Sequence, residues 1–250
     1  MRSPVDTIAA PPFPKDLVWV NSAPLHMAQQ ARHPVLIEFW DVCRPSSHRT
    51  LPYLRAWHER YASAGAGLRV IGVHSSALDA GHDEALVRAA IARLGIPYPV
   101  ALDPGFLLWR AYATPGWPSR YLFAPPLKLF ETHHGEGDYA GTERAIQELL
   151  ELDEPCTPLV DPADDDDAPI VVPTADVAGA YAGSYAAGEV WVVVDRPGTV
   201  IVNGTTHALD RLGAHRVIHH ERHEQGSVDV VAGPGLEVLI TAFLPGLAPL

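Results

Sequence analysis

Apolar residues follow two different spacings along this chain of 250 residues, one on each side of an acidic middle segment. In the N-terminal part, short apolar runs alternate with segments whose apolar residues recur every three or four positions, as in half-buried helices. The run VLIEFW at 35–40 predicts a central strand covered on both faces, and LRVIGV at 68–73 predicts the next strand. The spacing in 84–94 predicts an amphipathic helix. This alternation predicts an α/β fold with a mixed central sheet flanked by helices.

Beyond residue 175 the apolar residues recur at every second position, which is the period of a half-buried strand. Short strands separated by Gly, Pro and Asn turns predict a small all-β domain of the sandwich type. The segment before it is rich in proline and contains a run of aspartates at 164–167, which predicts an extended acidic linker. We therefore expect an N-terminal arm at 1–16, an α/β domain at 17–153, the linker at 154–175 and the β-sandwich at 176–250.

The charge and composition exclude several classes of partner. A net charge of −12 argues against nucleic acid and anionic lipid, because both are bound through a basic face. No segment reaches the length of a membrane span, and the N-terminus lacks the apolar stretch of a signal peptide, so the cytoplasm is the expected compartment. Two cysteines, Cys43 and Cys156, are too few for a disulfide framework, and no role is assigned to Cys156.

The stretch VLIEFWDVCRPSSHRTLPY at 35–53 combines a buried strand, a short polar loop and the start of a helix. A thiol at a helix N-terminus is acidified, because unpaired backbone N–H groups and the helix dipole stabilise the thiolate. Cys43 lies in this loop beside Arg44, whose positive charge also favours the thiolate. The stretch predicts thiol chemistry, with one thiol where such sites usually have two.

Further motifs follow this stretch along the chain. After FW at 39–40 come eight residues and RTLPYLRAWHERY, then VIGVHSS, LGIPYPVALD, LWRAY, GWPSRYLF and HHGEGDYAGTERAIQELL. Together they resemble the thioredoxin-like ectodomain of DipZ-type proteins, which is related to the TlpA and ResA thiol-disulfide oxidoreductases and to the thioredoxin part of NHL-repeat proteins. The resemblance covers most of residues 14–152 and implies a redoxin with a thioredoxin fold. DipZ ectodomains also carry a C-terminal β-sandwich resembling a carbohydrate-binding module, and residues 188–245 are similar in character but shorter.

The loop departs from the family pattern FW-x-x-x-C-x-x-C-x-RTLPY, so its CxxC motif is degenerate. Aligned without gaps, the two cysteine positions fall on Arg44 and Ser47, with Cys43 one position earlier. A shifted register, which needs an offset on each side, pairs Cys43 with Ser46. In both registers the resolving thiol is missing, so Cys43 would need a protein thiol or a low-molecular-weight thiol to release a mixed disulfide. The alternative is that Cys43 is a small apolar filler.

The resemblance also implies roles for residues outside the loop. Glu38 falls where thioredoxins keep a buried carboxylate behind the cysteines, and in an apolar strand it needs a raised pKa or a basic partner such as Arg44 or His48. Trp117-Pro118 matches the family's cis-proline, which lies against the active-site loop and presents backbone groups to an extended substrate. Trp40 and Trp117 complete the expected substrate groove around Pro118.

Two classes of function remain open. The first is an oxidoreductase of altered, monothiol type, in which Cys43 exchanges a mixed disulfide or is oxidised to a sulfenic acid. The second is a catalytically inactive scaffold that binds a peptide or a glycan. A third hypothesis, a peroxiredoxin-like peroxidase, is disfavoured because Trp40 replaces the threonine that precedes the peroxidatic cysteine by three residues.

In the β domain, three aromatic residues are candidates for stacking on a carbohydrate ring, although such residues in a sandwich are more often core. They are Tyr181, Tyr185 and Trp191. A group of histidines at 215–223 suggests a metal, but neighbouring residues of a strand face opposite sides and the spacing matches no common zinc motif. Neither a metal site nor a cofactor is predicted, since the chain also lacks a Gly-rich phosphate loop.

Overall fold

The computed structural model describes residues 7–64 and 67–250, and residues 1–6 of the predicted arm lie outside the described residues. The chain divides into two compact units. The first contains the residues up to Asp41 and Ser46–Val160, and the second contains Val42–Pro45 and Asp161–Leu250. The main boundary therefore follows Val160, inside the segment predicted as the linker.

The first unit is built on a six-stranded mixed sheet with the strand order β1-β4-β3-β2-β5-β6. β2, β3 and β4 run parallel to one another, whereas the other strand pairs are antiparallel. The strands are β1 Val18–Val20, β2 Val35–Trp40, β3 Arg69–His74, β4 Val100–Leu102, β5 Ser119–Ala124 and β6 Lys128–His134. The predicted mixed sheet is confirmed, and the apolar run at 35–40 is its inner strand β2.

Helices connect and cover these strands. They are α1 Pro45–Tyr61, α2 Glu84–Arg93, α3 Leu107–Ala111 and α4 Tyr139–Leu150, with the 3-10 helices η1 Met27–Gln30 and η2 Asp79–His82. α2 begins where its sequence favours a cap, because the Asp83 carboxylate accepts the N–H groups of Ala85 and Leu86. Of the helices in residues 7–64 and 67–250, none is both long enough and apolar enough to cross a membrane.

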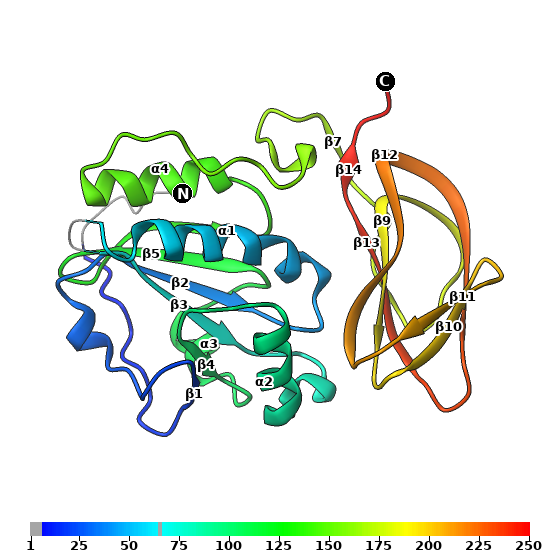
Figure 1. Ribbon diagram of the computed structural model, residues 1–250, viewed down its shortest axis with the longest axis horizontal. Helices are drawn as coiled ribbons and strands as arrows, with labels where there is room; N and C mark the ends of the chain where they lie inside the picture. Colours follow the sequence, from blue (N-terminus) through cyan, green and yellow to red (C-terminus); the bar gives the residue numbers. More distant parts are fainter. Residues whose placement is uncertain (1–6, 65–66) are drawn as a thin grey trace. The chain divides into compact units, whose positions relative to one another are not determined.

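Both faces of the first sheet are covered, which explains why β2 is a continuous apolar run. On one face, Ile37 and Phe39 pack against Phe13, Met27 and Leu108, which come from the N-terminal segment, η1 and α3. On the other face α1 and α4 lie side by side (Figure 1), with Tyr53 stacked on Tyr139 at a ring-centroid distance of 3.8 Å.

The N-terminal segment pairs with the edge strand β6. The N–H of Leu129 donates to the carbonyl of Ile8 at 2.8 Å, and the N–H of Ala10 donates to the carbonyl of Leu127 at 3.0 Å. Residue Ala9 forms an isolated antiparallel bridge with Lys128. This pairing satisfies backbone groups that an edge strand would otherwise expose.

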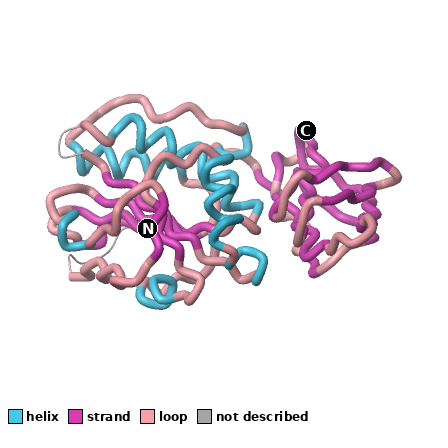
Figure 2. The backbone as a smooth tube through the Cα atoms, turned by 60° about the horizontal axis from the view of Figure 1, so that its bottom comes forward, coloured by secondary structure: helices cyan, strands magenta, loops and turns pink. Residues whose placement is uncertain are grey.

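The second unit is built of antiparallel strands joined by loops (Figure 2). One sheet has the order β11-β10-β12-β9-β13-β8, and β14 pairs with β7 in a separate two-stranded sheet. The elements are η3 Pro162–Asp164, β7 Ile170–Val171, β8 Val177–Ala178, β9 Ala182–Val194, β10 Gly198–Val202, β11 Thr205–Leu209, β12 Gly213–Ala232, β13 Val238–Leu244 and β14 Gly246–Leu247. The predicted all-β character is confirmed, and the sandwich packing stays a prediction.

The core of the second unit has the two-residue period that the sequence shows. Val190, Val192 and Val194 of β9 point inward and pack with Val228 and Phe243 from β12 and β13. β12 carries register shifts against β9 between Arg216 and Ile218 and between His219 and Glu224. Such bulges bend a long strand and interrupt its alternation of faces.

Candidate functional site

The loop predicted to carry the chemistry follows the carboxyl end of β2 and leads directly into α1. Because β2 and β3 are parallel, the residues that follow both strands meet at one edge of the sheet. α1 begins at Pro45, and proline is favoured in the first turn of a helix because its missing N–H has no intrahelical partner there. The strand, loop and helix therefore form as predicted.

Cys43 lies in this loop as a free thiol with no exposed surface. The second cysteine, Cys156, follows α4 and is half-buried, with its Sγ 3.8 Å from the carbonyl oxygen of Ala140. Burial, together with the charge of Glu143, raises the pKa of the Cys156 thiol. Neither cysteine forms a disulfide bond.

The three other residues predicted beside Cys43 have different environments. Ser47 is fully buried, and its Oγ accepts the N–H of Asp41 at 3.1 Å. Ser46 is half-buried, and its hydroxyl lies 3.5 Å from the carbonyl oxygen of Trp117. Arg44 keeps 30% of its side chain exposed and belongs to the second unit, as Cys43 does. A hydroxyl thus closes the loop from Asp41 to Ser47, at the position that the ungapped register gives to the second cysteine.

Glu38 is a buried carboxyl on β2, as predicted. The Thr50 hydroxyl donates to its Oε1 at 2.9 Å, whereas its Oε2 has no hydrogen-bond partner among the described residues. Burial raises the pKa of Glu38 to about 7, against the lowering effects of the Arg120 charge and the Thr50 hydrogen bond. The carboxyl can therefore change protonation near neutral pH.

The charge that acts on Glu38 is that of Arg120 and not that of the expected Arg44 or His48, and Arg120 stands directly opposite Glu38 in the β2–β5 register. Its side chain is 2% exposed, and its guanidinium lies 5.0 Å from the ring centroid of Tyr139 and 5.9 Å from that of Trp57. It also donates a hydrogen bond to the carbonyl of Gly137. The charge is thus held by aromatic faces and a backbone oxygen inside the unit.

The residues expected around the substrate groove differ in how far they are buried. The Trp117–Pro118 peptide bond is cis, as the resemblance implied. Trp117 is half-buried, and its ring centroid is 4.2 Å from that of Trp109. Trp40, in contrast, is fully buried and packs edge-on against His74 at 4.8 Å, so it offers no surface to a substrate.

Polar residues that the sequence reasoning missed lie at the same edge of the sheet. Asp41 follows β2, His74 ends β3, and the His74 Nε2 is 4.0 Å from the Asp41 Oδ1, with both residues buried. Burial, helped by the charge of His82, lowers the pKa of His74 to about 3. Ser75 accepts a hydrogen bond from the indole Nε1 of Trp117 at 3.2 Å. The available signal was polar residues directly after two neighbouring parallel strands.

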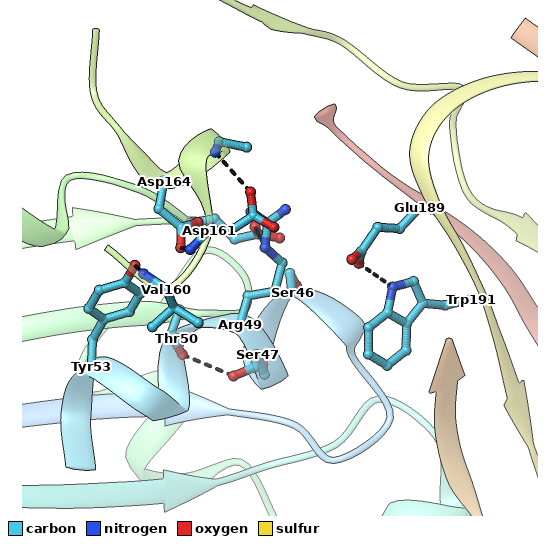
Figure 3. A network of polar contacts seen from close by, with 12 residues as sticks. Ser46, Ser47, Arg49, Thr50, Tyr53, Val160, Asp161, Asp164, Glu189 and Trp191 are labelled. Atoms are coloured by element: carbon cyan, nitrogen blue, oxygen red, sulfur yellow. Dashed lines mark hydrogen bonds and ion pairs between the residues drawn. The ribbon is translucent and has the colours of Figure 1, made fainter. Parts of the chain in front are cut away.

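The end of the first unit is held against α1. Figure 3 shows Tyr53 with its hydroxyl pointing toward Val160, whose N–H donates to it at 2.8 Å. In the same view the Thr50 hydroxyl points toward Ser47, and its Oγ1 is 3.0 Å from the Ser47 carbonyl oxygen. α1 therefore holds the chain segment that leaves the unit.

The aromatic candidates of the second unit are engaged in the unit itself. Tyr185 is buried and stacks on Phe243 at 5.7 Å, and Tyr181 contacts the same ring edge-on at 5.7 Å. The indole Nε1 of Trp191 donates to the Glu189 Oε2 at 2.7 Å (Figure 3). Tyr185 also lines a pocket of this unit, together with Thr174, Ser184, Ala186, Gln225 and Gly226.

Three of the β12 histidines have separate partners, whereas the Nδ1 of His223, which is buried, has no hydrogen-bond partner among the described residues. His215 contacts the carbonyl of Arg211 at 2.9 Å, and His219 lies 3.3 Å from Glu189. His220 contacts the Tyr185 hydroxyl at 2.8 Å. Among the residues that the structure describes, a search for three or more His, Cys, Asp or Glu side chains placed to hold a metal ion finds no group.

Comparisons with known proteins agree with this fold. No protein-family model matches the chain. It is 28% identical to DipZ of Mycobacterium bovis over 254 residues, which is 93% of this chain and 36% of DipZ. It is 25% identical to the thiol-disulfide oxidoreductase ResA of Halalkalibacterium halodurans over 121 residues, which is 48% of this chain and 62% of ResA. This chain therefore spans little more than a third of the length of DipZ.

Solved structures give the fold of the first unit. A thioredoxin-like superfamily protein of known structure matches with a TM-score of 0.53 at 22% identity, covering 60% of this chain and 100% of that chain. The match confirms the thioredoxin fold that the motifs implied, and the sequence comparisons confirm the resemblance to DipZ. The chain is a homologue of DipZ and of ResA, and its first unit has the thioredoxin fold.

Proposed function

We propose that the first unit binds an extended segment of a protein partner beside Pro118 and does not perform a dithiol cycle. The observation that carries this proposal is Ser47, which stands at the position of the resolving cysteine, is fully buried and holds the Asp41 N–H. A mixed disulfide is released when a second thiolate attacks its sulfur, and a serine hydroxyl does not perform that step. The loop keeps its shape without the group that completes turnover.

The side chains next to Pro118 support binding. Phe106, Trp109 and Trp117 are half-buried and contact one another, with ring centroids of Trp117 4.2 Å from Trp109 and 6.3 Å from Phe106. Leu107 adds a side chain that is 53% exposed. Rigid aromatic side chains offer a large contact area at a low cost in conformational entropy. Pro118 itself is buried, so a partner segment that docks beside it would lie on this aromatic cluster.

Restoring the cysteine pair tests the absence of a dithiol cycle. We expect the wild-type protein to reduce insulin disulfides with dithiothreitol no faster than Cys43→Ser does. The variant Arg44→Cys/Ser47→Cys should gain activity, because it places two thiols at the family positions. Ser46→Cys, which pairs a thiol with Cys43 in the shifted register, is the matched control and should gain little. Wild-type turnover that Cys43→Ser abolishes would contradict the proposal.

The proposed binding of an extended segment is tested with reduced, carboxymethylated ribonuclease A as an extended polypeptide probe. We expect Trp117→Ala to weaken binding about tenfold, since aromatic anchors at an interface each contribute more than 1 kcal/mol. Val172→Ala, which truncates a side chain that is 86% exposed in the second unit, is the control. Equal affinity of the wild type and Trp117→Ala would show that the polypeptide does not dock at Trp117.

Single-thiol exchange at Cys43 is a second candidate. Its support is the place of the thiol, directly before Arg44 and the start of α1 at Pro45, where positive charge and backbone N–H groups favour a thiolate. The absence of exposed surface on Cys43 opposes it. In a Cys156→Ser background, we expect a thiol reagent to label Cys43 far more slowly in native protein than in urea. Equal rates would favour this candidate over binding alone.

Carbohydrate binding is a separate proposal for the second unit. Its support is the pocket beside Tyr185, of about 520 Å³, whose lining includes the polar residues Thr174, Ser184 and Gln225. Hydroxyl and amide groups of this kind can bond sugar hydroxyls. We expect Gln225→Ala to abolish any retention of the protein on a glycan array, and no retention of the wild type would end this proposal.

A further inference from the structure

Phe106 has a backbone conformation that its residue type does not favour. It directly precedes the first residue of α3 and has a φ of 56°, in the left-handed region. That conformation crowds the Cβ atom, and the residues other than glycine that adopt it are mainly Asn and Asp, whose short polar side chains bond to nearby backbone. A phenylalanine lacks such a group, and the Phe106 side chain makes no hydrogen bond to the start of α3. The conformation of Phe106 is therefore strained.

Core packing does not account for this strain. Leu127 is the other large apolar residue with a positive φ among the described residues, at 73°, and it is 9% exposed and packs in the core of the first unit. Phe106, in contrast, is half-buried. Its ring contacts two other half-buried rings, Trp109 at 5.8 Å and Trp117 at 6.3 Å between centroids. Strained residues cluster at sites that bind ligands, and these rings form the surface proposed to bind a partner segment.

Asp103 holds the turn in which Phe106 lies. Its carboxylate accepts the N–H of Leu107 on Oδ1 at 2.7 Å and the N–H of Trp109 on Oδ2 at 2.9 Å. Its carbonyl accepts the N–H of Phe106 at 3.0 Å, and its own N–H donates at 2.8 Å to the carbonyl of His74, the last residue of β3. Asp103 is 1% exposed, so these hydrogen bonds are shielded from water. They tie the start of α3 to the sheet with Phe106 in the left-handed conformation.

We propose that Asp103 is a positioning residue that keeps Phe106 left-handed, so that the rings of Phe106 and Trp117 together bind a large apolar side chain of the docked segment. This inference rests on the docking proposed beside Pro118. The direction of a side chain follows its backbone conformation, so a change of φ would turn the Phe106 ring away. The indole Nε1 of Trp117 donates to Ser75, so the two rings offer carbon atoms to the segment and favour an apolar side chain.

Two substitutions at Phe106 separate the ring from the strain. Phe106→Ala removes the ring and keeps the strain, whereas Phe106→Gly removes both. We expect both variants to bind reduced, carboxymethylated ribonuclease A about tenfold more weakly than the wild type does, as for Trp117→Ala. The glycine variant should nevertheless unfold at a higher urea concentration than the alanine variant.

Glu151→Gly is the matched control for relief of strain. Glu151 is exposed, has a φ of 55° and follows the last residue of α4, on the other face of the sheet. Glycine is favoured at such a helix end, so the variant should unfold at a higher urea concentration than the wild type and keep its affinity for the probe.

The preference for an apolar side chain is tested by competition. The competitors are two peptides of Gly, Ser and Thr that differ only at their central residue, Phe in one and Asn in the other. We expect the Phe peptide to displace the probe from the wild type about tenfold more strongly, because a buried aromatic anchor contributes more than 1 kcal/mol. The difference should disappear in Phe106→Ala. Equal competition by the two peptides on the wild type would contradict the apolar preference.

Asp103→Asn tests the positioning role. The amide replaces one acceptor oxygen by a donor that faces a backbone N–H. The affinity should fall about as far as in Phe106→Ala, and no further when the two substitutions are combined, because both remove the same contact. A residue that only supports the fold would lower the affinity again in the double variant.

Leu107→Pro makes the same test without changing a buried charge, and it replaces Asp103→Asn if urea unfolding shows that the latter does not fold. Proline removes the N–H that donates to Asp103 and drives the residue before it to extended backbone, yet it is accepted at the first position of a helix. The affinity should fall further than in Leu107→Ala, which keeps the N–H.

The outcomes separate this inference from the docking on which it rests. The inference is overturned if both Phe106 variants bind the probe as the wild type does while Trp117→Ala binds it more weakly. It is also overturned if Asp103→Asn or Leu107→Pro lowers the affinity when the Phe106 ring is already absent, or if the glycine variant is no more stable than the alanine variant. Wild-type affinity in Trp117→Ala would overturn the docking beside Pro118 itself.

Discussion

Glu38 and Glu143 are two buried carboxyl groups of the first unit, and they differ in how their oxygens are satisfied. Glu143, 1% exposed on α4, accepts five hydrogen bonds at 2.7–3.1 Å. The donors are Trp57 Nε1, Arg60 Nη1, the Tyr61 hydroxyl, and the N–H and hydroxyl of Thr157. Glu38 has the Thr50 hydroxyl on one oxygen and, among the described residues, no hydrogen bond on the other.

The difference shows two uses of the same buried group. Glu143 joins α4, α1 and the segment after α4, so its hydrogen bonds hold three parts of the chain in one arrangement. Glu38 lies on β2, near the carboxyl end of that strand, and burial raises its pKa to about 7. A saturated carboxylate fixes structure, whereas a half-satisfied one can exchange a proton near neutral pH.

Glu143→Gln should have the largest effect on stability. The glutamine side chain places an NH₂ donor against groups that are themselves donors, and it removes the charge that faces Arg60 at 3.1 Å. We expect a loss of about 3–4 kcal/mol in the free energy of unfolding, as for other buried charge networks that lose one partner. Urea unfolding followed by tryptophan fluorescence measures it.

Glu154→Gln is the matched control, because Glu154 is 48% exposed and binds the same Arg60 at 2.7 Å. An exposed ion pair contributes little, so the loss should stay below about 0.5 kcal/mol. Similar losses in the two variants would mean that Glu143 acts no differently from a surface charge.

Glu38→Gln should change the pH dependence of stability. The folded-state pKa of Glu38, about 7, exceeds its ordinary value of 4.5, so the folded protein holds the proton that the unfolded chain releases. The stability linked to this proton is fully present below pH 4.5 and is lost as the pH rises through 7, by up to ~3 kcal/mol. Relative to the wild type, the glutamine variant should therefore gain about that amount between pH 4.5 and 8.

Comparing Glu38→Gln with the wild type removes the contribution of His74 to the pH dependence of stability. Its pKa is lowered to about 3, so the stability it contributes is lost as the pH falls below its ordinary value of 6.5, opposite in sign to Glu38. Both proteins contain His74, and the difference between their urea curves at each pH isolates Glu38. If the difference in unfolding free energy between the wild type and Glu38→Gln stays constant from pH 4.5 to 8, Glu38 has the same pKa in the folded and the unfolded state.

The fold could be predicted from local pattern, because β2 and its loop lie within one stretch of sequence. The missing resolving cysteine was visible in the same way. Arg120 could not be found as the partner of Glu38, since their opposition depends on the register between β2 and β5. Trp40 was expected at the groove, but it points into the unit, and strand period alone does not say which face is covered.

The structural role of Glu143 could not be predicted either, because a glutamate in an amphipathic helix is normally a solvated residue. Its role depends on Trp57 and Tyr61 from α1 and on Thr157 from the following segment. Each of these residues is ordinary in its own stretch of sequence. Long-range hydrogen bonds between such residues are set by packing, and a local pattern does not record them.

Thr50→Val should have the smallest effect, and it tests the single hydrogen bond of Glu38. The Thr50 hydroxyl has one hydrogen and lies between the Glu38 Oε1 at 2.9 Å and the Ser47 carbonyl at 3.0 Å. When Glu38 is protonated it can donate to Thr50, which then donates to Ser47; when it is ionised, the hydrogen of Thr50 must turn to the carboxylate.

Valine removes the donor that lowers the pKa of Glu38, so that pKa should rise further and the variant should lose about 1 kcal/mol, more at pH 8 than at pH 5. Thr142→Val is the matched control, because the Thr142 hydroxyl is buried and has no hydrogen-bond partner among the described residues. Replacing an unpaired buried hydroxyl by a methyl group breaks no hydrogen bond and removes an unsatisfied polar atom, so stability should stay the same or rise, equally at both pH values. If the two variants behave alike in urea, the Thr50 hydroxyl does not interact with Glu38, and the contrast with Glu143 becomes one between a satisfied carboxyl and a fully unsatisfied one.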